Sequence, residues 1–280
     1  QNRINIKAGD GVGKFKDTSN ICISKFALDV LNENLLDIIP LGSNLEIEII
    51  FPRGKFLAER TSNKSFGVVD GLSIIGTTAE TYISASPEQL NESKSELSKI
   101  LANHHRKNII FVIGENGLDL AKNINHDFPI IKVGNWLGPM LVEAAIKNVK
   151  GVILLGYHGK LIKLAGGIFN THNHLADARI EILVYLAIEE KVPIEIIYKF
   201  YKCSNIEDAL IIVEGLNAPI AEKLWIKIAN KVESKTVEYL MKYSNNDLQV
   251  GAALFDKNRK IRWLGTNGKY MFKDAYTIKS

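Results

Sequence analysis

A pattern that occurs three times between residues 108 and 165 most constrains the fold of this chain. Each time, a short apolar run leads into a glycine-containing loop, and the loop leads into a segment with helical periodicity. The apolar runs are residues 108–113, 130–133 and 151–155. Runs that are apolar throughout and that alternate with helices predict a parallel β-sheet covered by helices on both faces.

The three glycine loops are residues 114–117, 134–138 and 156–159. Right-handed crossovers place all three at the carboxyl edge of one sheet. Glycines there let backbone N–H groups approach a ligand, and each following helix adds a partial positive charge at its N-terminus. One such loop alone could be no more than a tight turn. Together, the three predict a ligand cleft.

The first part of the chain has a different pattern of apolar and turn residues, which predicts a smaller α+β domain. A helix is expected around Phe26, Val30 and Leu31, which recur at three- and four-residue spacing. A strand is expected over 45–51, and Pro52-Arg53-Gly54 predicts the turn of a hairpin that continues through Phe56. We therefore divide the chain into an α+β domain, 1–75, and an α/β domain, 76–280. The second domain is expected to end in helices and a closing hairpin, 248–254 with 260–264.

The composition of the chain argues against several classes of protein. No apolar run reaches the roughly 18–20 residues of a membrane helix, and no secretory signal opens the sequence. The 2 cysteines offer no disulfide framework and indicate a reducing, cytoplasmic location. The net charge of +4 is too small to indicate nucleic-acid binding. We expect no nucleic-acid or membrane partner, and the oligomeric state stays open, a homo-oligomer included.

Polar residues concentrate between residues 157 and 181. This stretch holds His158, His172 and His174, three of the 6 histidines of the chain. Lys160 and Lys163 are three residues apart and are expected to share one face of a short helix. On the next helix, the spacing places Asp177 and Glu181 on one face and Arg179 on another.

Three interpretations compete for the segment 170–174. His172, His174 and Asp177 could bind zinc or iron, although the spacing matches no helical metal motif. Alternatively, Asn170 or Thr171 caps a helix and the histidines are exposed without a function. In the third interpretation, the histidines, Asn170 and the two nearby lysines project into the cleft toward an anionic substrate. We favour this ligand cradle, because the third glycine loop brings a further histidine to the same edge.

The segment 159–183, GKLIKLAGGIFNTHNHLADARIEIL, closely resembles the signature block of the cobalt-precorrin-5B C1-methyltransferase family of anaerobic cobalamin biosynthesis. Residues 11–13, 51–54, 66–78 and 134–138 add further matches, so the resemblance spans about residues 8–190. Two features depart from the family pattern. The chain lacks the usual upstream Thr-Gly-Thr-Cys-rich segment, so part of the site is expected outside this numbering. Glu115-Asn116 stands where the family tends to have a Gly-Asn-Tyr-Gly-like turn.

The resemblance implies methyl transfer from S-adenosylmethionine to C1 of a cobalt-corrinoid substrate, with no metal bound by the protein itself. It also implies that a Rossmann-like parallel-sheet domain is joined to the α+β domain. Two alternatives remain: a metal-dependent hydrolase using His172, His174 and Asp177, and a corrinoid-binding module without turnover.

The resemblance further implies roles for individual residues. His158 or His172 is a candidate catalytic base, since histidine titrates near neutral pH. Residues expected to bind the substrate and its carboxylates are Lys160, Lys163, Asn170, Thr171, His174 and Arg179. The residues expected to line the cofactor's adenosine are Gly114, Glu115, Asn116, Gly117, Gly134 and Asn135, with Glu115 as a ribose acceptor.

Overall fold

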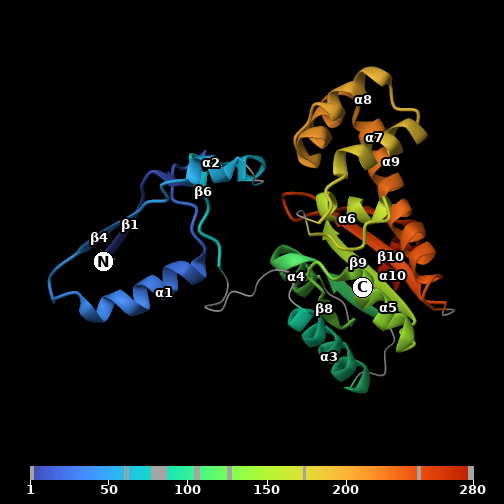
Figure 1. The fold of residues 1–280 in the computed structure, drawn as a ribbon, viewed down its shortest axis with the longest axis horizontal. Coiled ribbons are helices and arrows are strands. Elements are labelled where there is room, and N and C mark those ends of the chain that lie inside the picture. The colour runs from blue at the N-terminus through green and yellow to red at the C-terminus, as the bar shows by residue number, and fades with distance from the viewer. Residues whose placement is uncertain are drawn as a thin grey trace. The chain divides into compact units, whose positions relative to one another are not determined.

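The computed structural model describes residues 3–59, 61, 63–76, 87–103, 108–124, 128–172, 175–244 and 247–276. The chain is a mixed α/β protein that forms two compact units, Gln1–Tyr82 and Ile83–Ser280 (Figure 1).

Unit 1 contains short helices and three two-stranded sheets in its described part. β1 pairs with β4 and β2 pairs with β6 in parallel, whereas β3 pairs with β5 antiparallel. Its elements are β1 (Ile4–Ala8), β2 (Gly11–Val12), β3 (Lys14–Phe15), α1 (Lys25–Leu35), the 3-10 turn η1 (Leu36–Ile38), β4 (Leu45–Ile49), α2 (Gly54–Ala58), η2 (Asn63–Phe66), β5 (Val68–Val69) and β6 (Gly71–Leu72).

Three glycines let the backbone segments of unit 1 cross at close range. A Cβ atom added to Gly54 or Gly71 would lie 1.9 Å from the carbonyl oxygen of Gly11, which itself has a φ of +76°. The hairpin predicted to continue through Phe56 is therefore wrong, because Gly54 begins α2 at this crossing. β4 instead finds its partner in β1, which is far away in sequence.

Unit 2 is built on a five-stranded sheet with the order β11-β10-β9-β7-β8 in the described residues. β7, β8, β9 and β10 are parallel, and β11 joins β10 antiparallel at the edge. Its elements are α3 (Pro87–Asn103), β7 (Asn108–Val112), α4 (Gly114–Asn123), β8 (Ile130–Lys132), α5 (Leu137–Ile146), β9 (Gly151–Tyr157), α6 (His158–Ala165), α7 (Arg179–Glu189), α8 (Ile194–Tyr201), α9 (Ile206–Leu240), β10 (Gln249–Phe255), β11 (Ile261–Leu264) and α10 (Thr266–Tyr276).

Helices cover both faces of this sheet, as the apolar strands predict. Successive residues of β7 lie in two different hydrophobic cores, one on each face of the sheet. On one face, Ile109 and Phe111 pack with side chains of α3, α5, α6 and α9. Ile110 and Val112 pack on the other face with α4 and α10. A strand buried on both faces has no solvent side, which explains why its sequence is apolar throughout.

The carboxyl ends of the four parallel strands meet at one edge of the sheet. β7, β8, β9 and β10 end there at Val112, Lys132, Tyr157 and Phe255. The loops predicted over 114–117 and 156–159 do not form, because residues 114–117 begin α4, Gly156 and Tyr157 complete β9, and His158 begins α6. Side chains at this edge are consequently placed by regular elements rather than by a loop.

The long helix α9 contains a break at Asn217, which has an extended backbone (φ −161°) shortly before Pro219. The side-chain oxygen of Asn217 accepts a hydrogen bond from the N–H of Ile220 and so caps the second helical segment. Among the helices in the described ranges, none is long and apolar enough to span a bilayer.

Candidate functional site at the carboxyl edge of the sheet

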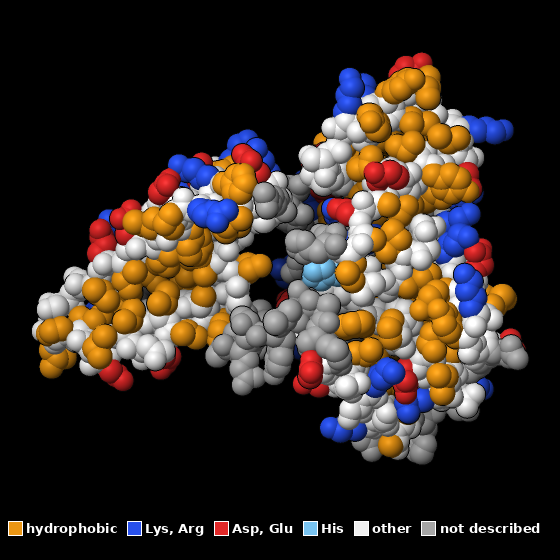
Figure 2. Space-filling view, viewed as in Figure 1, with side chains coloured by type: hydrophobic (Ala, Val, Ile, Leu, Met, Phe, Trp, Pro, Cys, Tyr) orange, Lys and Arg blue, Asp and Glu red, His pale blue; other side chains and the backbone are white. Residues whose placement is uncertain are grey.

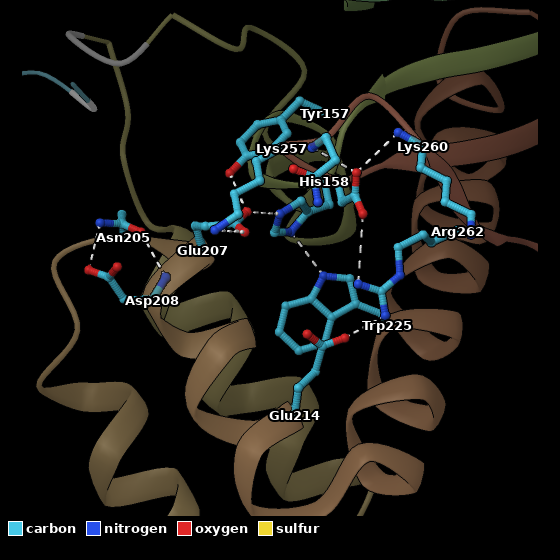
Figure 3. A network of polar contacts seen from close by, with 12 residues as sticks. Tyr157, His158, Asn205, Glu207, Asp208, Glu214, Trp225, Lys257, Lys260 and Arg262 are labelled. Atoms are coloured by element: carbon cyan, nitrogen blue, oxygen red, sulfur yellow. Dashed lines mark hydrogen bonds and ion pairs between the residues drawn. The ribbon is translucent and has the colours of Figure 1, made fainter. Parts of the chain in front are cut away.

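A buried polar network begins at the last residue of β9 (Figure 3). The Tyr157 hydroxyl donates a hydrogen bond to Oε2 of Glu207 at 2.8 Å, and Nε2 of His158 lies 2.9 Å from the same oxygen. The indole N–H of Trp225 donates to Nδ1 of His158 at 2.9 Å. His158, Glu207 and Trp225 are buried, with exposed fractions of 1%, 3% and 0%. The network thus links β9 and α6 to two separate parts of α9: Glu207 lies in its first turn, and Trp225 lies after the break at Asn217.

The chemistry of the donors fixes the protonation state of His158. An indole N–H can only donate, so Nδ1 of His158 is an acceptor and the ring hydrogen is on Nε2. Nε2–H then donates to Glu207. Burial lowers the pKa of His158, which agrees with a neutral ring. Both ring nitrogens of His158 have partners inside the protein.

Glu207 provides the negative charge of the network. Burial alone would raise its pKa, but the hydrogen bonds from His158 and Tyr157 and the charge of Lys257 outweigh burial and lower it. Burial and the adjacent Glu207 raise the pKa of Tyr157, so the phenol keeps its proton. The resulting unit is a carboxylate held by two neutral donors.

Lys160 and Lys163 share one face of α6, as their spacing predicts. Both ammonium groups donate to the carbonyl oxygen of Thr171, at 3.3 Å and 3.2 Å, and Lys163 also donates to that of Ala176 at 2.7 Å. Lys163 is fully buried. Burial lowers the pKa of both lysines, that of Lys163 to about 8. The two lysines therefore hold Thr171 against α6, and Lys163 also holds Ala176 there.

A side-chain pair also ties this segment to the loop after β8. The Thr171 hydroxyl donates to Oδ1 of Asn135 at 2.9 Å, and the Thr171 N–H donates to the Asn135 carbonyl at 3.3 Å. The backbone N–H of half-buried His172 donates to Oδ1 of Asn170 at 3.0 Å. His174 lies outside the described residues. Lys160, Lys163, Asn135 and Thr171 are thus brought together.

The residues predicted for the cofactor lie beyond β7 and β8. Gly114 and Gly134 have φ values of +72° and +56°, and among the described residues no atom apart from their own neighbours along the chain lies within 4 Å of where their Cβ atoms would be. Glu115, in the first turn of α4, forms an ion pair with Lys132 at the end of β8. Asn116 is exposed and Gly117 is buried. The open space beside the two glycines is compatible with a ligand that approaches the backbone.

Arg179 does not point away from Asp177, contrary to the helical spacing argument. Asp177 precedes α7, and both of its carboxylate oxygens accept hydrogen bonds from the Arg179 guanidinium, at 2.6 Å and 2.7 Å. Both residues line a pocket of about 580 Å³ whose walls come from α7, the end of α8 and the segment before α9. Exposed apolar side chains gather over α7 and α8 (Figure 2), among them Tyr185, Ile188 and Tyr198.

The described residues contain no group of three histidine, cysteine or acidic side chains that could hold a metal ion. The proposed set of His172, His174 and Asp177 is tested only in part, because His174 is not described. Asp177 is engaged by Arg179.

The sequence interpretation missed Glu207 and Trp225. Glu207 lies in the first turn of α9 beside Asp208, where acidic residues are common because they favour the positive end of the helix dipole. No local signal distinguishes it from such a residue. Its partner His158 is 49 positions away along the chain.

Two family models and several curated proteins match the sequence of this chain. The CbiD family model matches residues 1–82, and the model of the CbiD C-terminal domain matches residues 170–266. A cobalt-precorrin-5B C(1)-methyltransferase from Prochlorococcus marinus strain MIT 9312 is 62% identical over 273 residues, covering 98% of this chain and 74% of that protein. The enzyme of the same name from strain MIT 9515 is 64% identical over 266 residues, covering 95% and 72%.

A solved structure, the cobalamin biosynthesis protein CbiD from Archaeoglobus fulgidus, is 24% identical and has a TM-score of 0.38, covering 62% of this chain and 56% of that one. The sequence relationship is much closer and extends over nearly the whole chain. The chain belongs to the CbiD family, the cobalt-precorrin-5B C(1)-methyltransferases.

Proposed function

We propose that this protein transfers the methyl group of S-adenosylmethionine to C1 of cobalt-precorrin-5B in anaerobic cobalamin biosynthesis. The carrying observation is the 62% identity, over 98% of the chain, to an enzyme named for this reaction. The free cysteines are consistent with a cytoplasmic enzyme. We expect no partner besides this small-molecule substrate and the methyl donor, other than a second copy of the chain.

The sheet order supports a Rossmann-like ligand site in unit 2. With β7 counted first, the order is 2-1-3-4-5, which is the order of flavodoxin-like doubly wound sheets. The connections leave β7 and β9 in opposite directions, so the topological switch point lies between the ends of these two strands. Ligands of open α/β sheets bind in the crevice at this point.

The chain's own residues fit the methyl donor at this edge. The open backbone at Gly114 and Gly134 leaves room for a nucleoside, flanked by Glu115, Asn116, Gly117 and Asn135. S-adenosylmethionine supplies an electrophilic methyl group on a positively charged sulfur. What the protein contributes is position and exclusion of water, which can provide most of the acceleration of such a transfer.

We assign substrate binding to polar residues of α6, of the segment that follows α6, and of the start of α7. Corrinoid precursors carry peripheral carboxylates, for which Lys160 and Arg179 supply positive charge. Lys163, Asn170, Thr171 and His174 are assigned to substrate binding as well, and we assign proton transfer from the methylated ring to His172. His158 acts through Glu207 as a positioning residue.

The test combines an activity assay with paired variants. Purified protein, cobalt-precorrin-5B and S-adenosylmethionine are expected to give a product that mass spectrometry shows to have gained one methyl group. His172→Ala and Lys160→Ala should lower turnover at least about tenfold with unchanged thermal unfolding. Lys150→Ala is the matched control, because Lys150 is exposed and precedes β9 at the opposite edge of the sheet. Wild-type turnover in both variants removes these residues from the site, and an unmethylated product refutes the function.

A further inference from the structure

The two oxygens of the Glu207 carboxylate have unequal surroundings. Oε2 accepts both hydrogen bonds of the network, from Tyr157 and from His158. Oε1 makes no hydrogen bond within the described part of the chain, and the nearest cation, Nζ of Lys257, is 3.8 Å away. In the described residues, Trp136 Nε1 is the fully buried side-chain nitrogen or oxygen without a hydrogen bond, so Oε1 of Glu207, which has none either, is open to solvent. The underused oxygen is therefore an acceptor available to a ligand.

This oxygen is held in place by rigid elements. His158 is fixed by the Trp225 donor, so its hydrogen bond keeps the Glu207 side chain in one orientation. The start of α9 is fixed by Asn205, whose side-chain oxygen accepts from the N–H of Asp208 at 2.9 Å. An acceptor whose position is set before binding loses little entropy when a ligand arrives.

The oxygen also lies at the right edge of the sheet. Figure 3 shows Glu207 beside Tyr157, which is the last residue of β9. β7, which ends next to Gly114, is the neighbouring strand of β9 in the sheet, at the usual separation of about 4.8 Å. A ligand with its nucleoside over Gly114 can reach toward Glu207 across the end of β9.

We infer that Glu207 binds the amino-acid end of the methyl donor, accepting a hydrogen bond from its α-ammonium group through Oε1. The inference rests on the proposed function. The α-ammonium group carries both the positive charge that a buried anion requires and the N–H donors that an acceptor oxygen requires. The sulfonium has charge but no N–H, and the ribose hydroxyls have donors but no charge. Lys257 is partly exposed and too distant for a hydrogen bond, so it does not block this oxygen.

The test is calorimetric titration of the full chain with three probes. S-adenosylmethionine and S-adenosylhomocysteine both carry the α-ammonium group, and 5′-methylthioadenosine lacks the amino-acid end. Glu207→Gln preserves the shape of the side chain and an oxygen for Tyr157 and His158, but places an NH₂ donor where Oε1 is. We expect at least about a tenfold loss of affinity for the first two probes and none for the third.

Two further variants sharpen the result. Tyr157→Phe removes one of the hydrogen bonds that hold Glu207 and is expected to give a smaller loss with the same ligand pattern. Glu214→Gln is the matched control: Glu214 lies on the same helix and pairs with Arg262 instead, so all three affinities should stay at their wild-type values. Thermal unfolding of each variant verifies that it is folded.

Each other outcome overturns the inference. A loss for S-adenosylmethionine alone assigns Glu207 to the sulfonium, an equal loss for all three probes assigns it to the nucleoside or to the fold, and unchanged affinities remove it from the site. If the wild-type protein binds none of the probes, the proposed use of this methyl donor fails together with the inference. Wild-type binding with an unaffected Glu207→Gln variant refutes the inference alone.

Discussion

Lys163 is a charged side chain that binds the protein's own backbone. Its ammonium group is buried and donates to the carbonyl oxygens of Thr171 and Ala176. These two carbonyls bracket the segment that carries His172 and His174. Placing a cation there costs solvation, and the hydrogen bonds to the carbonyls offset that cost. In the described residues, Lys163 thus ties Thr171 and Ala176 to α6.

Lys163 should make the stability of the protein depend on pH. Its pKa is 10.5 in the unfolded chain and about 8 in the folded chain. Between these values the unfolded state binds more protons, so the free energy of unfolding rises with pH. Relative to Lys163→Met, the wild-type protein should therefore gain stability between about pH 8 and about pH 10. Urea unfolding of both proteins at these pH values measures the difference, and a difference that does not change with pH contradicts the prediction.

At the residue scale, the sequence shows which side chains are polar or titratable, but it does not show which partners they have or whether they are buried. His158 was predicted to be a ligand-facing base because it follows an apolar strand and a glycine. Its burial depends on Glu207 and Trp225, which are contributed by a helix that begins 48 residues later. By contrast, the three-residue spacing of Lys160 and Lys163 is local, and their shared helical face was predicted correctly.

At the scale of elements, the glycine crossing of unit 1 replaces side-chain packing with backbone contact. Gly11, Gly54 and Gly71 come from β2, α2 and β6, and their backbones meet where no Cβ atom fits. Within the described residues, few apolar side chains of unit 1 are fully buried: Ile4, Val12 and Val68. We therefore expect close backbone contact to contribute more to the stability of unit 1 than to that of unit 2.

Substituting a crossing glycine should destabilise the protein strongly. In Gly71→Ala the new methyl group would lie 1.9 Å from the Gly11 oxygen, which is fixed backbone. We expect the free energy of unfolding of this unit to fall by at least about 2 kcal/mol. Gly76→Ala is the control, since among the described residues its Cβ would meet only Phe26, at 4.0 Å, and a change within about 0.5 kcal/mol is expected. Chemical denaturation measures both, and equal effects in the two variants would refute the prediction.

The elements that were predicted correctly are those whose pattern of apolar residues follows directly from their burial. The runs 108–113, 130–133 and 151–155 contain the strands β7 and β8 and most of β9, because a strand covered on both faces must be apolar at every position. The segment after Phe51 was predicted wrongly as a hairpin. Its turn residues are ordinary, and the reason for the helix is the contact of Gly54 with Gly11, some forty residues earlier. Such a contact leaves no trace in local periodicity.

At the scale of the whole molecule, the methyltransferase and the alternative hydrolase differ in whether the protein holds a metal. We expect purified protein to contain no stoichiometric zinc or iron, because Asp177 is already bound by Arg179 and the described residues form no three-ligand cluster. Elemental analysis after dialysis against a chelator tests this, with methyl transfer measured on the same sample. About one zinc or iron per chain would contradict this expectation, and in a sample without methyl transfer it would support the hydrolase instead.

The Trp225 contact also decides where protons can travel. An indole nitrogen gives up its hydrogen only with great difficulty and cannot accept another, so a relay that runs inward from Tyr157 through Glu207 and His158 has no exit at its inner end. A hydrogen ion released while the macrocycle is alkylated accordingly cannot leave through this chain of groups. The interior of unit 2 then serves as an electrostatic support and not as a conduit.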